Sequence, residues 1–223
     1  MSTETILLFI VLLAGFYMAW NIGANDVSNA MGTSVGSGAL TLMKAVIIAG
    51  VLEFCGAFFL GGNVSKTIQG GLVDTTLFVQ DPHILLFGMI SALLATALWL
   101  QVSSYFGWPV STTHAIVGSL IGFGLFHGGS EAVFWKEVGT VASSWVISPV
   151  LSGILSFAIF TTLQKKVLYN LDPIKATKRV IPFLIGLLFL VFTLTMLLSG
   201  VGRFSVHLSN MNVLSIGLAV AVP

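Results

Sequence analysis

Long hydrophobic runs alternate with short polar segments along this chain of 223 residues. Apolar runs of about 20 residues match the length of a helix that crosses a hydrocarbon core of ~30 Å. The pattern predicts membrane-spanning helices over residues 5–22, 43–61, 84–106, 138–163 and 182–200, and a last apolar stretch from residue 211 onward. Glycine-rich or polar segments predict loops at residues 36–38, 61–63, 69–82 and 128–130.

The segment of residues 110–126 departs from this pattern. It is apolar enough to enter a membrane, yet it follows Pro109, opens on polar residues and contains three glycines. At roughly 17 residues it is short for a span, so it predicts a re-entrant hairpin or a broken helix. Irregular backbone at membrane depth is tolerated only where protein or water covers it, and a binding site is the usual reason for it.

Composition then fixes the class of protein. Hydrophobic residues make up 56% of the chain and charged residues only 8%, which a soluble domain cannot hide from water. Nine basic residues against eight acidic ones leave a net charge of +1, so nucleic-acid binding is not expected. We expect an all-α integral membrane protein, one membrane domain over residues 1–223, with about six transmembrane helices plus a re-entrant helical hairpin.

The basic residues are unevenly distributed. Five of the nine fall in the single predicted loop of residues 164–181. They are Lys165, Lys166, Lys175, Lys178 and Arg179. Because cytoplasmic loops carry an excess of Lys and Arg, this loop is predicted to face the cytoplasm.

A first polar run lies between residues 21 and 30. If it is helical, Asn21, Asn25 and Asn29 are spaced four residues apart and share one face, with Asp26 beside them. Amide and carboxylate oxygens are hard ligands that suit an alkali cation, so the run predicts a site for a coupling ion. The alternative is that these side chains cap a helix or join two helices by hydrogen bonds.

A second polar run follows Pro109. Proline ends the preceding helix and places Ser111, Thr112 and Thr113 in the first turn of the next, where backbone N–H groups lack partners. Free amides, hydroxyl donors and the positive end of a helix dipole together favour a tetrahedral oxyanion. An ordinary Ser or Thr cap remains the alternative, and a lone histidine such as His114 is more often a packed side chain than a ligand.

Two further polar residues interrupt predicted helices. Glu53 lies in the middle of the second apolar run, where a carboxylate is costly unless it is protonated or paired, so it either titrates or binds a cation. Gln101 can present another oxygen to the cavity that would hold the cation, or it can form a hydrogen bond to a neighbouring helix. Gly118 and Gly122 form a small-xxx-small pair, which predicts close helix packing.

A cation site and an oxyanion site within apolar helices favour secondary transport. No Gly-x-x-x-x-Gly-Lys-Ser/Thr run is present, so no nucleotide is expected to drive it. A hydrolase with Ser111, His114 and Asp26 as a triad is disfavoured, because the serine and histidine are only three residues apart and no Gly-x-Ser-x-Gly turn occurs. A passive anion channel is a further alternative.

Four motifs, in order, resemble the inorganic phosphate transporter (Pit-type) family of cation-coupled symporters. They are the run from Gly23 to Ala30, the Gly-Thr-Ser-Val-Gly-Ser-Gly run from Gly32, Glu53 before Gly61-Gly62, and Pro-Val-Ser-Thr-Thr-His from Pro109. The likeness covers about residues 16–126. It implies symport of inorganic phosphate with sodium, or alternatively protons, through two inverted repeats, and sulfate is the alternative substrate.

The resemblance also implies roles for residues, with no organic cofactor. The expected sodium ligands are Asn25, Asp26, Asn29, Glu53, Gln101 and Ser111. The expected phosphate ligands are Asn25, Ser111, Thr112, Thr113 and His114. Glu53 is in addition expected to be an acid essential for transport.

Only one copy of the Gly-Ala-Asn-Asp run occurs in the chain. The chain is therefore expected to be the first half of a longer transporter, with the first inverted repeat over about residues 5–163 and further helices over 182–223. A second half on a separate chain or segment, a homodimer of complete transporters, and a place in the inner or plasma membrane are the corresponding expectations.

Overall fold

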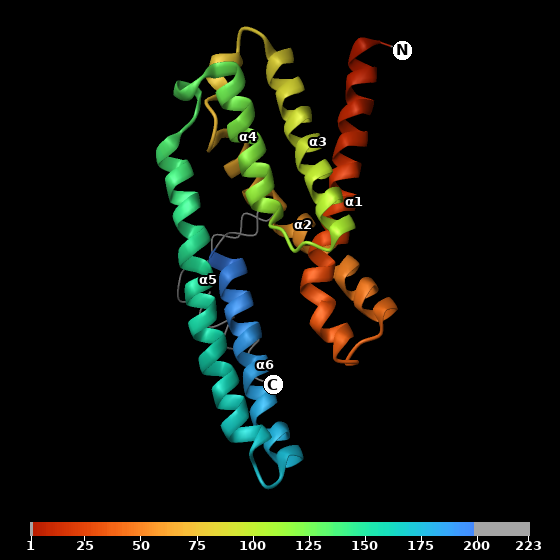
Figure 1. Cartoon of the computed structure of the whole chain (residues 1–223), viewed down its shortest axis with the longest axis vertical. Helices are drawn as coiled ribbons and strands as arrows, with labels where there is room; N and C mark the ends of the chain where they lie inside the picture. Colours follow the sequence, from red (N-terminus) through yellow and green to blue (C-terminus); the bar gives the residue numbers. More distant parts are fainter. Residues whose placement is uncertain (1, 199–223) are drawn as a thin grey trace. The chain divides into compact units, whose positions relative to one another are not determined.

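The computed structural model describes residues 2–198, apart from the side chains of residue 60 and of residues 63–70 and 196–198. Figure 1 shows an arrangement built from helices, and an isolated bridge between Val73 and Val133 is the extent of β pairing in the described part. The helices are α1 (Thr3–Gly36), α2 (Leu42–Gly70), η1 (Thr75–Phe78), α3 (Pro82–Phe106), α4 (Thr112–Gly128), η2 (Ser130–Ala132), α5 (Trp135–Leu163), the π-helix η3 (Gln164–Leu168) and α6 (Pro173–Leu198).

The predicted all-α class is confirmed. Five helices among the described residues are long and apolar enough to cross a membrane, namely α1, α2 up to Phe59, α3, α5 continued by η3, and α6 up to Thr195. The sixth predicted helix, from residue 211, lies outside the described residues. The chain divides into two compact units, of which the first comprises residues up to Phe58 and Asn63–Val138, and the second Phe59–Gly62 and the residues from Gly139.

Helix α1 is much longer than the predicted helix of residues 5–22. It continues through the whole first polar run and ends at Gly36, where the predicted turn begins. The polar side chains do not break the helix because they bond to it. Asn21 Nδ2 donates to the Tyr17 carbonyl at 2.8 Å, and Ser28 Oγ donates to the Asn25 carbonyl at 2.7 Å. The helical reading of the run is confirmed.

The structure corrects two predicted loops. Residues 61–63 lie inside α2 because successive glycines in an apolar helix weaken it without ending it. The basic segment of residues 164–181 is mostly helical, since η3 extends α5 and α6 already begins at Pro173. The helix predicted over residues 182–200 thus begins earlier, at Pro173, and Pro182 lies inside it. The turn between these helices is confined to residues 169–172.

The structure also corrects the expected break within residues 110–126. This segment is one unbroken helix of 17 residues, α4, and the chain reverses before it, at residues 107–111. Gly107 ends α3 in the left-handed region, at φ 69°, and its N–H bonds back to the carbonyls of Ser103 and Ser104. Helices α3 and α4 therefore pack side by side as an antiparallel pair, as Figure 1 shows.

The far end of α4 is fixed to the loop that precedes α3. Asp74 N–H donates to the Ala132 carbonyl at 2.8 Å, and Phe134 N–H donates to the Leu72 carbonyl at 3.0 Å. The rings of Phe78 and Phe123 stack with centroids 5.3 Å apart. In this loop the Thr76 hydroxyl, which donates to Asp74 at 2.6 Å, holds the pKa of that carboxyl below its usual value.

Close packing of α3 against α4 depends on a glycine that the pattern did not single out. A methyl group at Gly88 would overlap the ring of Phe123. A methyl group at Gly118 or Gly122 would meet no atom of the described residues within 4 Å, so this pair does not mediate the contact predicted for it here.

Candidate functional site

Helices α1 and α3 lie side by side and run in the same direction (Figure 1). Polar side chains join them along a seam. Near the middle of α1, the Tyr17 hydroxyl donates to Gln101 Oε1 at 2.8 Å. Two turns further along, Asn25 Nδ2 approaches both Ser104 Oγ and the Trp108 carbonyl at 3.4 Å. The seam is therefore built from residues eight apart on α1 and three apart on α3, both of which are spacings of one helix face.

The carboxamides of the first polar run lie on this face. Asn21 and Asn25 are 2% and 3% exposed, whereas Asn29 is exposed. Asn29 Nδ2 donates to Asn25 Oδ1 at 3.1 Å, so the two amides are directly linked. Because an amide oxygen has two lone pairs, Asn25 Oδ1 retains the capacity for a further partner.

The acidic residue of the run contacts the second polar run. Thr112 Oγ1 lies 3.0 Å from Asp26 Oδ1 and 3.2 Å from Asp26 Oδ2, and its hydroxyl donates to the carboxylate. Asp26 is half-buried. Residues 86 positions apart in the sequence thus meet where α4 begins.

The first turn of α4 has the geometry of a capped helix start. Ser111 is the N-cap residue, and its Oγ accepts the N–H of His114 at 3.3 Å. Ser111, Thr113 and His114 are exposed, and Thr112 is half-buried. Ser111 can therefore cap α4 and still contact an anion, because a serine that accepts a hydrogen bond at Oγ keeps its hydroxyl proton to donate.

The position of Asp26 beside this turn has an electrostatic reason. The amino end of a helix carries a partial positive charge from its unpaired N–H groups, which stabilises a nearby anion. In a 17-residue helix such as α4 this end can attract either the Asp26 carboxylate or an added oxyanion. The two charges compete for one location unless a cation neutralises the carboxylate.

Glu53 lies elsewhere. Its exposed side chain lines a groove of about 790 Å³ together with Gly23, Ala24 and Val27, which are on a different face of α1 from Asn21 and Asn25. Gln101 lies in the α1–α3 seam, where its oxygen accepts the Tyr17 hydroxyl. The structure thus brings together Asn25, Asn29, Asp26 and Thr112, whereas Glu53 lies in a separate groove and Gln101 lies further along the α1–α3 seam.

Two contributors to the site were missed by sequence reasoning. Tyr17 precedes Asn21 by four residues, so the spacing that identified the asparagine face extends one turn further back to it. The Trp108 carbonyl has no signal in its side chain, since every residue carries such a group. The Trp108 carbonyl can accept a hydrogen bond from Asn25 because α3 ends at Gly107, so this carbonyl takes no part in the backbone hydrogen bonds of that helix.

Comparison with known proteins places the chain in a family. The model of the phosphate transporter family (PHO4) matches residues 22–221. The chain belongs to the phosphate transporter family. The predicted resemblance is thereby confirmed. The chain is a multi-pass membrane protein, with five apolar helices of membrane length among its described residues.

Individual relatives agree with this placement. A relative from Chlamydia trachomatis is 49% identical over 195 residues, which cover 87% of this chain and 46% of that protein. The inorganic phosphate transporter 2-1, chloroplastic, of Arabidopsis thaliana is 52% identical over 177 residues, 79% of this chain and 30% of that protein.

A solved structure of a sodium-dependent phosphate transporter superposes with a TM-score of 0.86 at 38% identity, over 97% of this chain and 52% of that one. The chain thus spans about half the length of this neighbour and of the relative from Chlamydia. Both the family and the structural neighbour are transporters, the class that the polar runs predicted.

Proposed function

We propose that the chain takes part in cation-coupled symport of inorganic phosphate, with sodium as the coupling ion. The observation that carries this proposal is the contact of Thr112 with both oxygens of Asp26, which joins the predicted cation site to the predicted anion site. Family membership and the sodium dependence named for the structural neighbour support the choice of substrate and ion.

In the proposed mechanism sodium binds first. Asp26 supplies the negative charge, and the amide oxygens of Asn25 and Asn29 replace part of the hydration shell of the ion. Phosphate then binds at the first turn of α4, to the hydroxyls of Ser111, Thr112 and Thr113 and to His114. The roles of Glu53 and Gln101 as additional sodium ligands remain predictions.

Charge explains why the two ligands would travel together. A phosphate oxygen about 5 Å from an ionised Asp26 meets a repulsion of about 3 kcal/mol per unit charge at an effective dielectric constant near 20. Sodium at Asp26 removes this repulsion. Removal of about 3 kcal/mol of repulsion corresponds to a rise in phosphate affinity on the order of 100-fold, which is sufficient to couple phosphate binding to sodium binding.

The inverted repeat of the family supports a second half that completes the transport pathway, supplied by another segment or chain. Carriers built in this way expose a central site to each side of the membrane in turn. The energy comes from the sodium gradient, and the organisation of complete transporters into dimers is part of the same proposal.

The test is uptake of radiolabelled phosphate into liposomes that contain the chain together with a second half, with an inward sodium gradient, with an inward proton gradient or with neither. Asp26→Asn removes the charge while it keeps the shape, and sodium-dependent uptake should fall on the order of 100-fold. Glu137→Gln, in the exposed first turn of α5, is the matched control. Full sodium-dependent uptake by Asp26→Asn would refute the ion site, and equal competition by sulfate would refute the substrate.

A further inference from the structure

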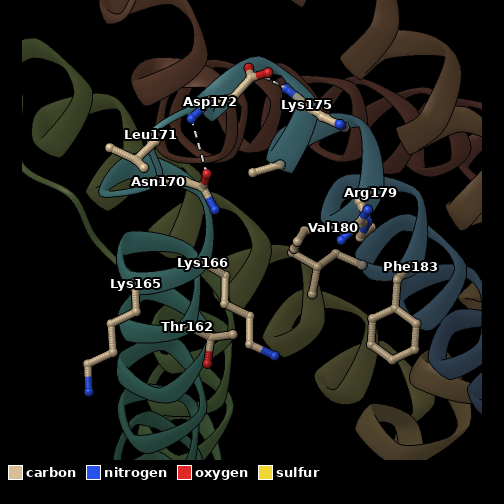
Figure 2. Close-up of a pocket in the computed structure, with 12 residues that line it drawn as sticks. Thr162, Lys165, Lys166, Asn170, Leu171, Asp172, Lys175, Arg179, Val180 and Phe183 are labelled. Atoms are coloured by element: carbon tan, nitrogen blue, oxygen red, sulfur yellow. Dashed lines mark hydrogen bonds between the residues drawn. The ribbon is translucent and has the colours of Figure 1, made fainter.

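A groove in the second unit is lined by none of the residues assigned to the proposed transport site. It has a volume of about 920 Å³ and is formed by the end of α5, by η3 and by the first turns of α6, as Figure 2 shows. Its polar lining includes Lys165, Lys166, Lys175 and Arg179. We call this surface the basic groove.

The basic groove has an excess of positive charge. Four basic residues line it, and Asp172 is the one acidic residue among its lining residues. Asp172 is engaged in capping α6, where its Oδ1 accepts the N–H of Lys175 at 3.1 Å. Within the part of the chain that the structure describes, none of the four cations forms an ion pair, so their charge is available to a ligand.

The wall of the basic groove that α6 forms is largely apolar. Val180, Phe183 and Leu184 line it, and with Arg179 they lie on one face of α6 because they are spaced three and four residues apart. From Pro173 to Thr195 α6 is apolar enough to cross a membrane. The cations are therefore at the end of a membrane-length helix, and the apolar wall leads from them along the same helix.

The side chains converge from two elements. Figure 2 shows Lys166 extending from η3 toward α6, where Arg179 and Phe183 lie, while Lys165 points away along the outer side of its helix. A guanidinium group and an ammonium group facing one groove suit a phosphate ester, because the planar fork of arginine binds two oxygens and lysine adds a point charge.

We propose that the basic groove binds an anionic phospholipid, with its headgroup phosphate at Lys166 and Arg179 and an acyl chain along Val180, Phe183 and Leu184. The positive-inside rule accounts for basic residues on one side of a membrane, but it does not require them to converge on one groove. Basic pockets between membrane helices are the usual sites for anionic headgroups. Free phosphate would gain nothing from the apolar wall.

The experiment compares lipid binding by two double variants of the full chain. Lys166→Gln/Arg179→Gln removes two cations of the groove. Lys44→Gln/Lys178→Gln removes two cations that do not line it, so the change in net charge is the same. The purified proteins are titrated in detergent with phosphatidylglycerol, with phosphatidylcholine and with inorganic phosphate, and bound lipid is counted by native mass spectrometry.

We expect the groove variant to bind phosphatidylglycerol about tenfold to thirtyfold more weakly, and the control variant to bind it as the unmodified chain does. Lys166→Arg/Arg179→Lys, which keeps both charges, should retain most of the affinity and shows whether the groove variant fails merely through misfolding. Equal weakening in both Gln variants, equal binding of phosphatidylcholine, or displacement of the lipid by millimolar inorganic phosphate would each overturn the proposal.

Discussion

One hydroxyl group connects the two polar runs of this protein. Thr112 is the first residue of α4, and its Oγ1 donates to the Asp26 carboxylate of α1. A hydrogen bond to a charged group contributes about 1.5–3 kcal/mol, which is more than a bond between neutral groups. At the scale of single residues, Thr112 is therefore the contact on which the geometry of the proposed site depends.

Replacement of this hydroxyl gives a direct prediction. Thr112→Val keeps the shape of the side chain but removes the donor, so the apparent affinity for phosphate in sodium-driven uptake should fall about 10- to 100-fold. Thr112→Ser retains the hydroxyl and should transport nearly normally. The measurement is the concentration dependence of uptake into liposomes that contain the variant together with a second half. If the Val and Ser variants behaved alike, the hydroxyl would have no part in the site.

At the scale of elements, the pairing of α3 with α4 positions the first turn of α4. The pair is fixed at one end by the short link from Gly107 to Ser111, and at the other by the bridge between the loops at Val73 and Val133. Between these ends, Gly88 allows Phe123 to lie against the backbone of α3. The site thus depends on packing some distance from the polar residues themselves.

This packing is testable by adding one methyl group. Gly88→Ala forces the Phe123 ring to move, so overpacking should lower the free energy of unfolding by about 1–3 kcal/mol. Gly122→Ala on α4 meets open space and serves as the control, with a neutral or slightly stabilising effect. The free energy of unfolding is measured by denaturant titration in mixed micelles. Equal stability of the two variants would contradict the inferred close contact.

At the scale of the whole molecule, much apolar surface is uncovered. None of the residues of α5 is buried within the described chain, and its exposed side chains include Ile147, Leu151 and Ile154. Lipid can cover a uniformly apolar face, but a transport pathway needs protein on both sides of its site. Since the chain spans about half the length of the Chlamydia relative and of the structural neighbour, we expect further protein to complete that pathway.

A two-part assay checks this expectation. The chain reconstituted by itself should show no sodium-dependent phosphate uptake above that of empty liposomes. Co-expression with the second half of a family member should yield uptake that Asp26→Asn abolishes. Uptake by the chain alone at the rate of the two-part assembly would show that no second half is required.

The positions of helices and of candidate polar residues were largely readable from the sequence, but the ends of helices were not. Hydropathy placed the end of the first helix at residue 22, because polar residues follow, whereas α1 continues to Gly36. Hydropathy measures the preference of a side chain for lipid, and it does not detect the backbone hydrogen bonds by which a helix continues through polar residues. Likewise, the helix predicted to begin at residue 182 begins at Pro173, because α6 includes the polar and basic residues before its apolar run.

The sequence by itself determined the class of protein, the family and the residue types of the site, since apolar run lengths and the motifs around Asp26 and Thr112 are local properties of the chain. Only the tertiary structure decided which of these residues meet. Asp26 and Thr112 are brought together by the packing of α1, α3 and α4, whereas Glu53, which belongs to α2, lies against another face of α1. That packing depends on contacts such as Gly88 with Phe123, which join residues far apart in the chain and have no local signal.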